Sequence, residues 1–159
     1  MITTPFTIEE VPNEAVLYVR VHKDKIQKKG LQIGLPNPGA FKNTPETGPD
    51  LSSDWNKYST PQDSRARIGR EFRPSKPGEF KNPSDFYIVS FVVQNIYDLD
   101  LNQQVEHSPM QDNFPDELEG KPWNQSHCSI IGDAEERRVR MIDIAKWEIP
   151  PPEYIASIE

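Results

Sequence analysis

Cysteine is almost absent from this sequence: Cys128 is the single one, so no disulfide can form within the chain. The sequence also lacks long hydrophobic runs, and its apolar stretches end far short of the roughly 20 residues that a membrane-spanning helix needs. The N-terminus has no basic segment followed by an apolar one, which is the pattern of a secretory signal. These absences favour a reducing compartment, and we expect a cytoplasmic protein without a membrane partner.

Short motifs that bring their own chemistry are missing as well. The chain has no glycine-rich phosphate loop, no paired Cys-x-x-Cys, no His-Glu-x-x-His and no nucleophile elbow. We therefore expect no cofactor. Any active site has to be assembled by the fold from residues that are distant in the sequence.

The composition indicates a small core within one domain. Only 35% of the 159 residues are hydrophobic, and 16 are prolines, so we expect long irregular connections around that core. Residues 1–14 are predicted to form an N-terminal arm, residues 15–149 a single α+β domain, and residues 150–159 a proline-rich C-terminal tail.

Hydrophobic periodicity predicts several strands and two helices. Leu17, Val19 and Val21 alternate with Tyr18, Arg20 and His22, as in a half-buried strand. Further strands are predicted at 51–55, 86–93, 102–107 and 126–131, and a helix begins at Thr60-Pro61. Periodicity also allows the run at 86–93 to convert into a helix at Ser90. The predicted fold is a small mixed β-sheet with a C-terminal helix packed on it and long proline-rich connections.

The C-terminal helix is predicted to begin at Asp133, which stands with Glu136 in a capping-box spacing. Four apolar residues of this helix are predicted to face the core and three arginines to face solvent. The apolar residues are Val139, Met141, Ile142 and Ala145, and the arginines are Arg137, Arg138 and Arg140. The prolines at 150–152 are expected to end regular structure and to leave an extended tail, which could dock in a groove of a partner.

Charge is distributed unevenly along the chain. Residues 20–81 hold 13 basic and 7 acidic side chains, whereas residues 82–120 hold 8 acidic ones and no lysine or arginine. Two faces for a protein partner would follow, one with Arg65, Arg67 and Arg70 and one with Asp112, Asp116 and Glu117. Alternatively, the two blocks fold side by side and neutralise each other. The arginines at 65–73 could contact nucleic acid, but the net charge of −7 disfavours that.

Histidines are the natural candidates for acid–base chemistry. If the strands at 15–22 and 126–131 are neighbours, Arg20, His22 and His127 could line one cleft, with Arg20 binding an anion and a histidine moving a proton. The alternative is that His127 is a satisfied core residue and His22 a surface one. A zinc site from His22, His107, His127 and Cys128 is not expected, because the adjacent residues 127 and 128 point to opposite faces of a strand.

Several short segments follow one another along the sequence: Leu17-Tyr18-Val19-Arg20-Val21-His22, Leu51-Ser52-Ser53-Asp54, the Pro61 helix, the apolar strand at 86–93, His107-Ser108-Pro109 and Asn124-x-x-His127-x-x-Ile130-x-Gly132. The arrangement resembles a loose group of small, uncharacterised bacterial proteins. The resemblance spans residues 15–147. It implies a bacterial origin, one compact α+β domain and a joint role for the three histidines, but no particular activity.

Two functions remain open from the sequence. The first is a non-enzymatic interaction module, a small bacterial accessory, adaptor or immunity-type subunit that docks another protein. The second is a small enzyme that acts on a nucleotide or RNA phosphate through an Arg/His site.

Overall fold

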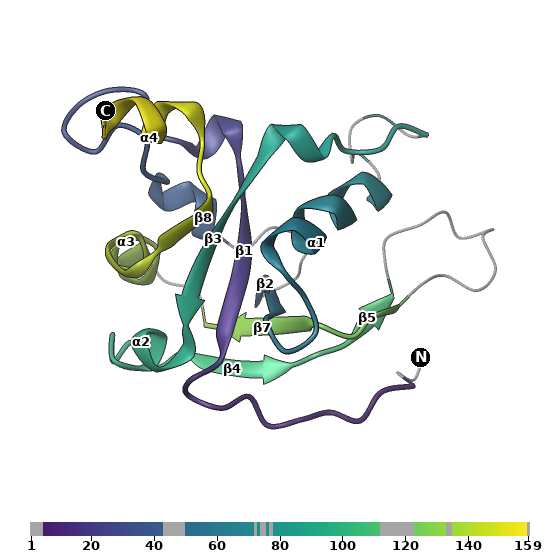
Figure 1. The fold of residues 1–159 in the computed structure, drawn as a ribbon. Helices are drawn as coiled ribbons and strands as arrows, with labels where there is room; N and C mark the ends of the chain where they lie inside the picture. Colours follow the sequence, from purple (N-terminus) through teal and green to yellow (C-terminus); the bar gives the residue numbers. More distant parts are fainter. Residues whose placement is uncertain are drawn as a thin grey trace.

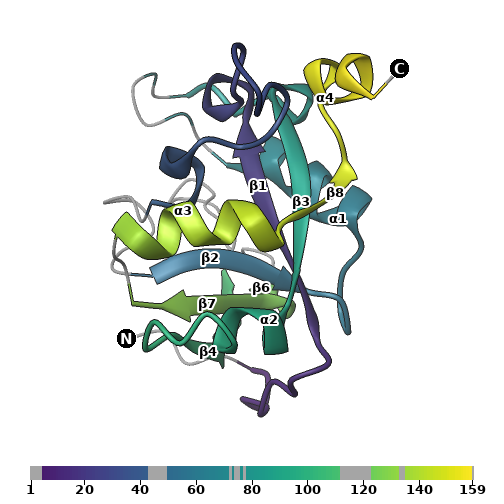
Figure 2. The same ribbon diagram turned by 90° about the vertical axis from the view of Figure 1, so that its left-hand side faces the viewer.

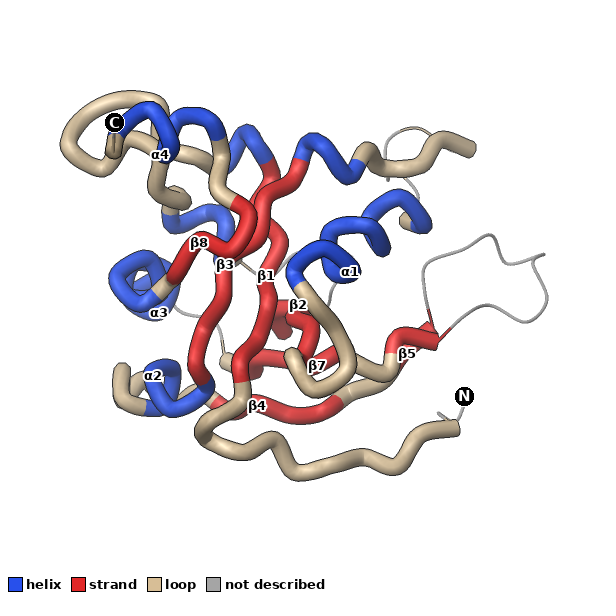
Figure 3. Tube along the Cα trace, in the orientation of Figure 1, coloured by secondary structure: helices blue, strands red, loops and turns tan. Residues whose placement is uncertain are grey.

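The computed structural model describes residues 5–42, 50–71, 73, 76, 78–111, 123–132 and 135–158. Six strands form one sheet in the order β4-β7-β2-β1-β3-β8 (Figures 1 and 3). Their bounds are β1 Val16–His22, β2 Asp50–Trp55, β3 Phe86–Val92, β4 Gln104–His107, β7 His127–Ile131 and β8 Lys146–Ile149. The short strands β5 (Met110–Gln111) and β6 (Trp123–Asn124) pair with each other.

The fold is α+β, as predicted, but the sheet is not mixed. Every pair of strands in the described part of the chain is antiparallel. β2 and β3 flank β1 on its two sides and both run opposite to it, so the helix between β2 and β3 does not connect parallel neighbours.

The helices are short. They are α1 Pro61–Ala66, α2 Val93–Tyr97, α3 Glu135–Ile144 and α4 Pro152–Ser157, with 3₁₀ turns η1 Lys23–Lys25, η2 Pro38–Phe41, η3 Arg67–Arg70 and η4 Pro83–Asp85. The predicted start of α1 is confirmed, because the Thr60 side chain accepts a hydrogen bond from the Asp63 N–H at 3.1 Å and Pro61 follows it. None of the described helices is long and apolar enough to cross a bilayer.

The main core lies on one face of the sheet, on the side of α2 and α3 (Figures 1 and 2). It includes Leu17, Val19 and Val21 of β1 together with Met141 and Ile142 of α3. The alternation predicted for β1 is therefore confirmed. The opposite face of β1 carries Tyr18, Arg20 and His22, and this polar face of the sheet is the side on which α1 lies.

Arg137 corrects the predicted orientation of α3. Its side chain is fully buried instead of facing outward, and its guanidinium donates hydrogen bonds to the carbonyls of Phe41 and Gly132 and to the Gln103 side chain. Val139, placed inside by the prediction, is 46% exposed. Arg137 and Met141 are four residues apart and share the buried stripe of the helix. The predicted cap residue Asp133 lies outside the described residues.

The C-terminal residues are not an extended tail. β8 adds to the edge of the sheet beside β3, and Pro152 then begins α4, where a proline at the first helical position is favoured. The loop before η2 closes onto α4: Lys28 and Glu153 form an ion pair at 2.9 Å, and the Trp147 indole N–H donates to the Gly34 carbonyl at 3.2 Å.

Replacing Gly34 with alanine is expected to loosen this contact. Gly34 has φ +87°, and an added Cβ would lie 2.5 Å from the Tyr154 Cα, so the backbone of α4 has to move. We expect the free energy of unfolding to fall by about 2–3 kcal/mol, with faster hydrogen exchange at the Tyr154 and Ile155 amides. Gly30→Ala is the matched control, because Gly30 has φ +83° and nothing within 4 Å of the added carbon. Equal losses in the two variants would contradict the close packing at Gly34.

Candidate functional site

A row of polar side chains crosses the sheet on the face opposite the main core. In the register of the strands, Ser90 lies opposite Tyr18, Tyr18 opposite Asp54, and Asp54 opposite His127. Residues directly opposite each other in an antiparallel pair point to the same face. Contrary to the supposition made from the sequence, the strands that carry Arg20 and His127 are not neighbours, because β2 lies between β1 and β7 and pairs with both.

Asp54 is the buried anchor of this row. One carboxylate oxygen accepts hydrogen bonds from Asn124 at 2.8 Å and Ser126 at 3.1 Å, and the other accepts one from Ser64 at 2.6 Å. Burial alone would raise the pKa of Asp54, but the positive charge of Arg20 and the hydrogen bonds outweigh it and lower the pKa below its ordinary value. Asp54 is therefore a carboxylate that ties β2 to α1 and to the turn before β7.

One ring nitrogen of His127 is hydrogen-bonded and the other, among the described residues, is not. Nδ1 lies 2.9 Å from the Ser108 carbonyl and 3.0 Å from the Ser108 hydroxyl, which itself contacts Ser129 Oγ at 2.8 Å. A carbonyl oxygen only accepts, so Nδ1 carries the proton. Nε2 is then a lone-pair acceptor, and it is buried without a hydrogen-bond partner among the residues that the structure describes.

The protonation of His127 follows from its surroundings. Burial lowers its pKa, and although the Asp54 charge acts in the opposite direction, the pKa stays below the ordinary histidine value. The ring is therefore neutral near pH 7, with its free base position at Nε2. A buried acceptor without a partner costs about 1–3 kcal/mol, so a use for that nitrogen is to be expected.

Arg20 and Glu71 complete the cluster. Arg20 Nη1 forms an ion pair with Glu71 Oε2, and each side chain is 25% exposed. Both charges act on His127: Arg20 lowers its pKa and Glu71 raises it. Arg20 also lowers the pKa of Asp54. Four groups, Arg20, Asp54, Glu71 and His127, thus form one electrostatic unit, which we call the polar-face site.

The other two histidines lie elsewhere. His22 is two residues beyond Arg20 on the same face of β1, but it is four residues from Tyr18, which is level with Asp54 and His127, roughly 13 Å away at about 3.3 Å per residue. Its Nδ1 caps η1 by accepting from the Asp24 N–H at 3.1 Å. His107 accepts from the Glu9 N–H at 3.0 Å and donates to the Gln125 carbonyl at 2.7 Å. Both nitrogens of His107 are therefore used to hold the N-terminal arm and the turn before β7.

The arginines predicted for partner binding are partly engaged within the fold. Arg65 is half-buried, donates to the Pro83 carbonyl at 3.0 Å and lies 5.5 Å from the centre of the Tyr87 ring. Arg67 is half-buried as well, and Arg70 is exposed. Asp112, Asp116 and Glu117, the predicted acidic partner surface, lie outside the described residues.

Cysteine and metal chemistry find no support in the described residues. Cys128 is fully buried, and burial raises the pKa of its thiol to about 12, which keeps it protonated and unreactive. Across the residues that the structure describes, no three His, Cys, Asp or Glu side chains are grouped as metal ligands.

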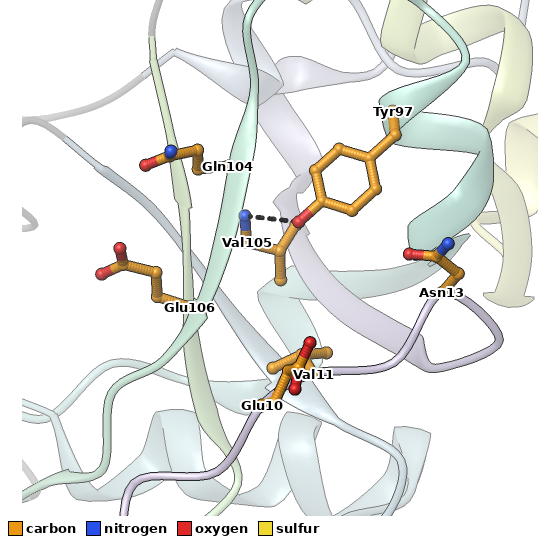
Figure 4. Close-up of a pocket in the computed structure, with 7 residues that line it drawn as sticks. All are labelled: Glu10, Val11, Asn13, Tyr97, Gln104, Val105 and Glu106. Carbon is orange, nitrogen blue, oxygen red and sulfur yellow. Dashed lines mark hydrogen bonds between the residues drawn. The ribbon is translucent and has the colours of Figure 1, made fainter.

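A separate hollow of about 410 Å³ lies between the N-terminal arm and the sheet edge (Figure 4). Its lining is Glu10, Val11, Asn13, Tyr97, Gln104, Val105 and Glu106. The Val105 N–H on the outer strand β4 donates to the Tyr97 hydroxyl at 3.2 Å, which blocks one of the pairing groups at this edge. The hollow includes none of the four residues of the polar-face site.

The polar-face site should make the fold sensitive to acid. Folding lowers the pKa of His127. Its contribution to stability is therefore complete above about pH 6.5, and it is lost as the pH falls toward the pKa that His127 has in the folded protein. Folding also lowers the pKa of Asp54, so a second loss of stability follows below about pH 3.9. We expect the free energy of unfolding, measured with urea, to fall between pH 7 and 5. His127→Gln should flatten this dependence, and an identical slope in the variant would contradict the assignment.

Comparisons with known proteins find no match: no protein-family model, no curated protein and no solved structure resembles the chain at a significant level. Function is therefore inferred from the site itself.

Proposed function

We propose that the chain is a small enzyme acting on a nucleotide or RNA phosphate, with the polar-face site as its active site. One observation carries the proposal: the neutral His127 ring holds a buried Nε2 with no hydrogen-bond partner among the described residues, and the charge of Arg20 acts on that ring. A positioned histidine base is the commonest acid–base group in enzymes, and a strongly perturbed pKa beside a charged partner is typical of catalytic residues.

The residues divide into clear roles. The Ser108 carbonyl fixes the ring and its proton, so that Nε2 is the position that accepts a proton from a sugar hydroxyl or a water. That oxygen then bonds to phosphorus, while the bond from phosphorus to the leaving oxygen breaks and the leaving oxygen takes a proton from solvent. Asp54 stabilises the imidazolium formed on His127, since its charge favours the protonated ring. Arg20 binds the phosphate oxygens.

The direct test is a substrate screen with the purified chain. Mononucleotides, dinucleotides and short single-stranded RNAs are incubated with wild type and with Arg20→Gln, and products are followed by chromatography and mass spectrometry. We expect turnover by wild type and a rise in KM for Arg20→Gln, because the variant loses the phosphate contact. Absence of both binding and turnover with every one of these ligands would overturn the proposal.

A non-enzymatic interaction module, the accessory or adaptor subunit, is the second proposal. It is favoured by exposed aliphatic side chains on two segments that pack together: Leu31 is fully exposed, and Ile155 and Ile158 of α4 are 43% and 67% exposed. Such residues mark protein contacts when they gather. Light scattering of the protein purified from its native host should show a stoichiometric companion that the double variant Leu31→Ser, Ile158→Ser loses. A monomeric wild type would count against this second proposal.

A further inference from the structure

The side chains of Arg20 and Glu71 form an ion pair with each other and, among the described residues, no other side-chain hydrogen bond or ion pair. Glu71 is the residue directly after η3, and its backbone is held by bonds from its N–H to the Ile68 carbonyl at 3.0 Å and from the Lys81 N–H to its own carbonyl at 2.8 Å. Its carboxylate accepts from Arg20 alone among the described residues. The Glu71 side chain can therefore leave Arg20 without moving the backbone that carries it.

Arg20 has more donors than this pair uses. A guanidinium offers five N–H groups in a planar fork, and Glu71 is its single acceptor in the part of the chain that the structure describes. Both side chains remain 25% exposed, so an anion in solution can reach the pair. Carboxylate and phosphate oxygens bind an arginine in the same way.

Glu71 also stands in the electrostatic field of the histidine base. Its charge acts on His127 together with that of Arg20. The Arg20–Glu71 pair therefore lies within electrostatic range of His127, and the proposed mechanism places the reacting phosphate on Arg20. With Arg20 positive, His127 neutral, and Asp54 and Glu71 negative, the cluster carries a net charge of −1, which repels an arriving anion while Glu71 stays in place.

We infer that Arg20 forms a subsite for a phosphoryl anion and that Glu71 occupies it in the free protein as an internal substitute. This inference rests on the proposed function, because it assigns the ligand class of the same site. A phosphate monoester or pyrophosphate binds by displacing the Glu71 carboxylate into solvent. Removing the Glu71 charge should then strengthen anion binding, whereas a purely structural ion pair would give no gain.

The test measures pyrophosphate and AMP binding by calorimetry for wild type and three variants. Glu71→Gln should bind about tenfold more tightly, equivalent to removing roughly 1.4 kcal/mol of competition. Arg20→Gln should lose binding, and so should the double variant with both changes. Glu79→Gln is the matched control, because Glu79 pairs with a different arginine, Arg73, at 3.3 Å in the same connection.

The outcomes separate the two proposals. Wild-type binding that depends on Arg20 but does not tighten in Glu71→Gln overturns the subsite inference and leaves the proposed function standing. Tighter binding that survives in the double variant overturns it too, because the anion then sits elsewhere. If neither wild type nor Glu71→Gln binds the anions and no turnover is found, the subsite inference and the proposed enzyme function are both overturned. If Glu71→Gln fails to fold, Glu71→Asp replaces it, with a shorter reach and an expected smaller gain.

Discussion

Replacing His127 with glutamine is expected to lower kcat on the phosphate substrate by about 10²–10⁴-fold, the usual contribution of a positioned acid–base group. The glutamine amide can still donate to the Ser108 carbonyl, so the contact with the residue that follows β4 is retained while the base is lost. KM should change little, because phosphate binding depends on Arg20. The measurement is steady-state kinetics across pH, where the variant should also lose the acidic limb of the profile.

Two neighbouring histidines provide the controls. His22→Gln should keep wild-type kcat, because His22 lies at the far end of β1 and caps η1. His107→Gln should lower stability more than chemistry, since both ring nitrogens of His107 are used in the fold. A His127→Gln enzyme with unchanged kcat, or one that is unfolded while His107→Gln is intact, would contradict a catalytic role.

Arg137→Leu is expected to cost about 3–5 kcal/mol of stability, as a broken buried charged network does. The guanidinium joins three segments: the Phe41 carbonyl of η2 at 2.7 Å, the Gly132 carbonyl after β7, and the Gln103 side chain before β4. Leucine fills part of the volume but leaves buried carbonyl groups without donors. Urea unfolding followed by circular dichroism measures the loss.

Arg140→Leu on the same helix is the control. Arg140 is exposed and pairs only weakly with Asp143, at 4.0 Å, so its loss should stay within about 0.5 kcal/mol. Similar losses in the two variants would show that Arg137 does not hold the three segments together.

The sequence predicts the strands whose patterns are long or strongly alternating. β1 alternates over seven residues, and β3 is apolar on both sides because Ile88 packs on the α1 side while Val89 and Phe91 join the main core. β8 is missed because its four residues follow α3 directly, with no glycine or proline between them. α4 is missed because Pro152 is interpreted as ending structure, whereas a proline also favours the first position of a helix.

The site is only partly visible from the sequence. Arg20 and His127 are chosen for their chemistry, and the strand register brings their strands close. Asp54 and Glu71 are missed because their role depends on which strand lies between β1 and β7, and on where the connection after η3 returns. Residue periodicity carries no information on either point. Arg137 shows the same limit: its charge suggests an outward position, but its spacing from Met141 places it in the core.

The state of the His127 ring tests the central claim most directly. Nitrogen-15 NMR of the histidine side chains at neutral pH reports which ring nitrogen carries the proton. We expect His127 to be neutral, with the proton on Nδ1, a pKa below that of an ordinary histidine, and an Nε2 signal that shifts when pyrophosphate or AMP is added. A charged His127 near pH 7, a proton on Nε2, or an Nε2 signal indifferent to both ligands would contradict the assignment of this nitrogen as the catalytic base.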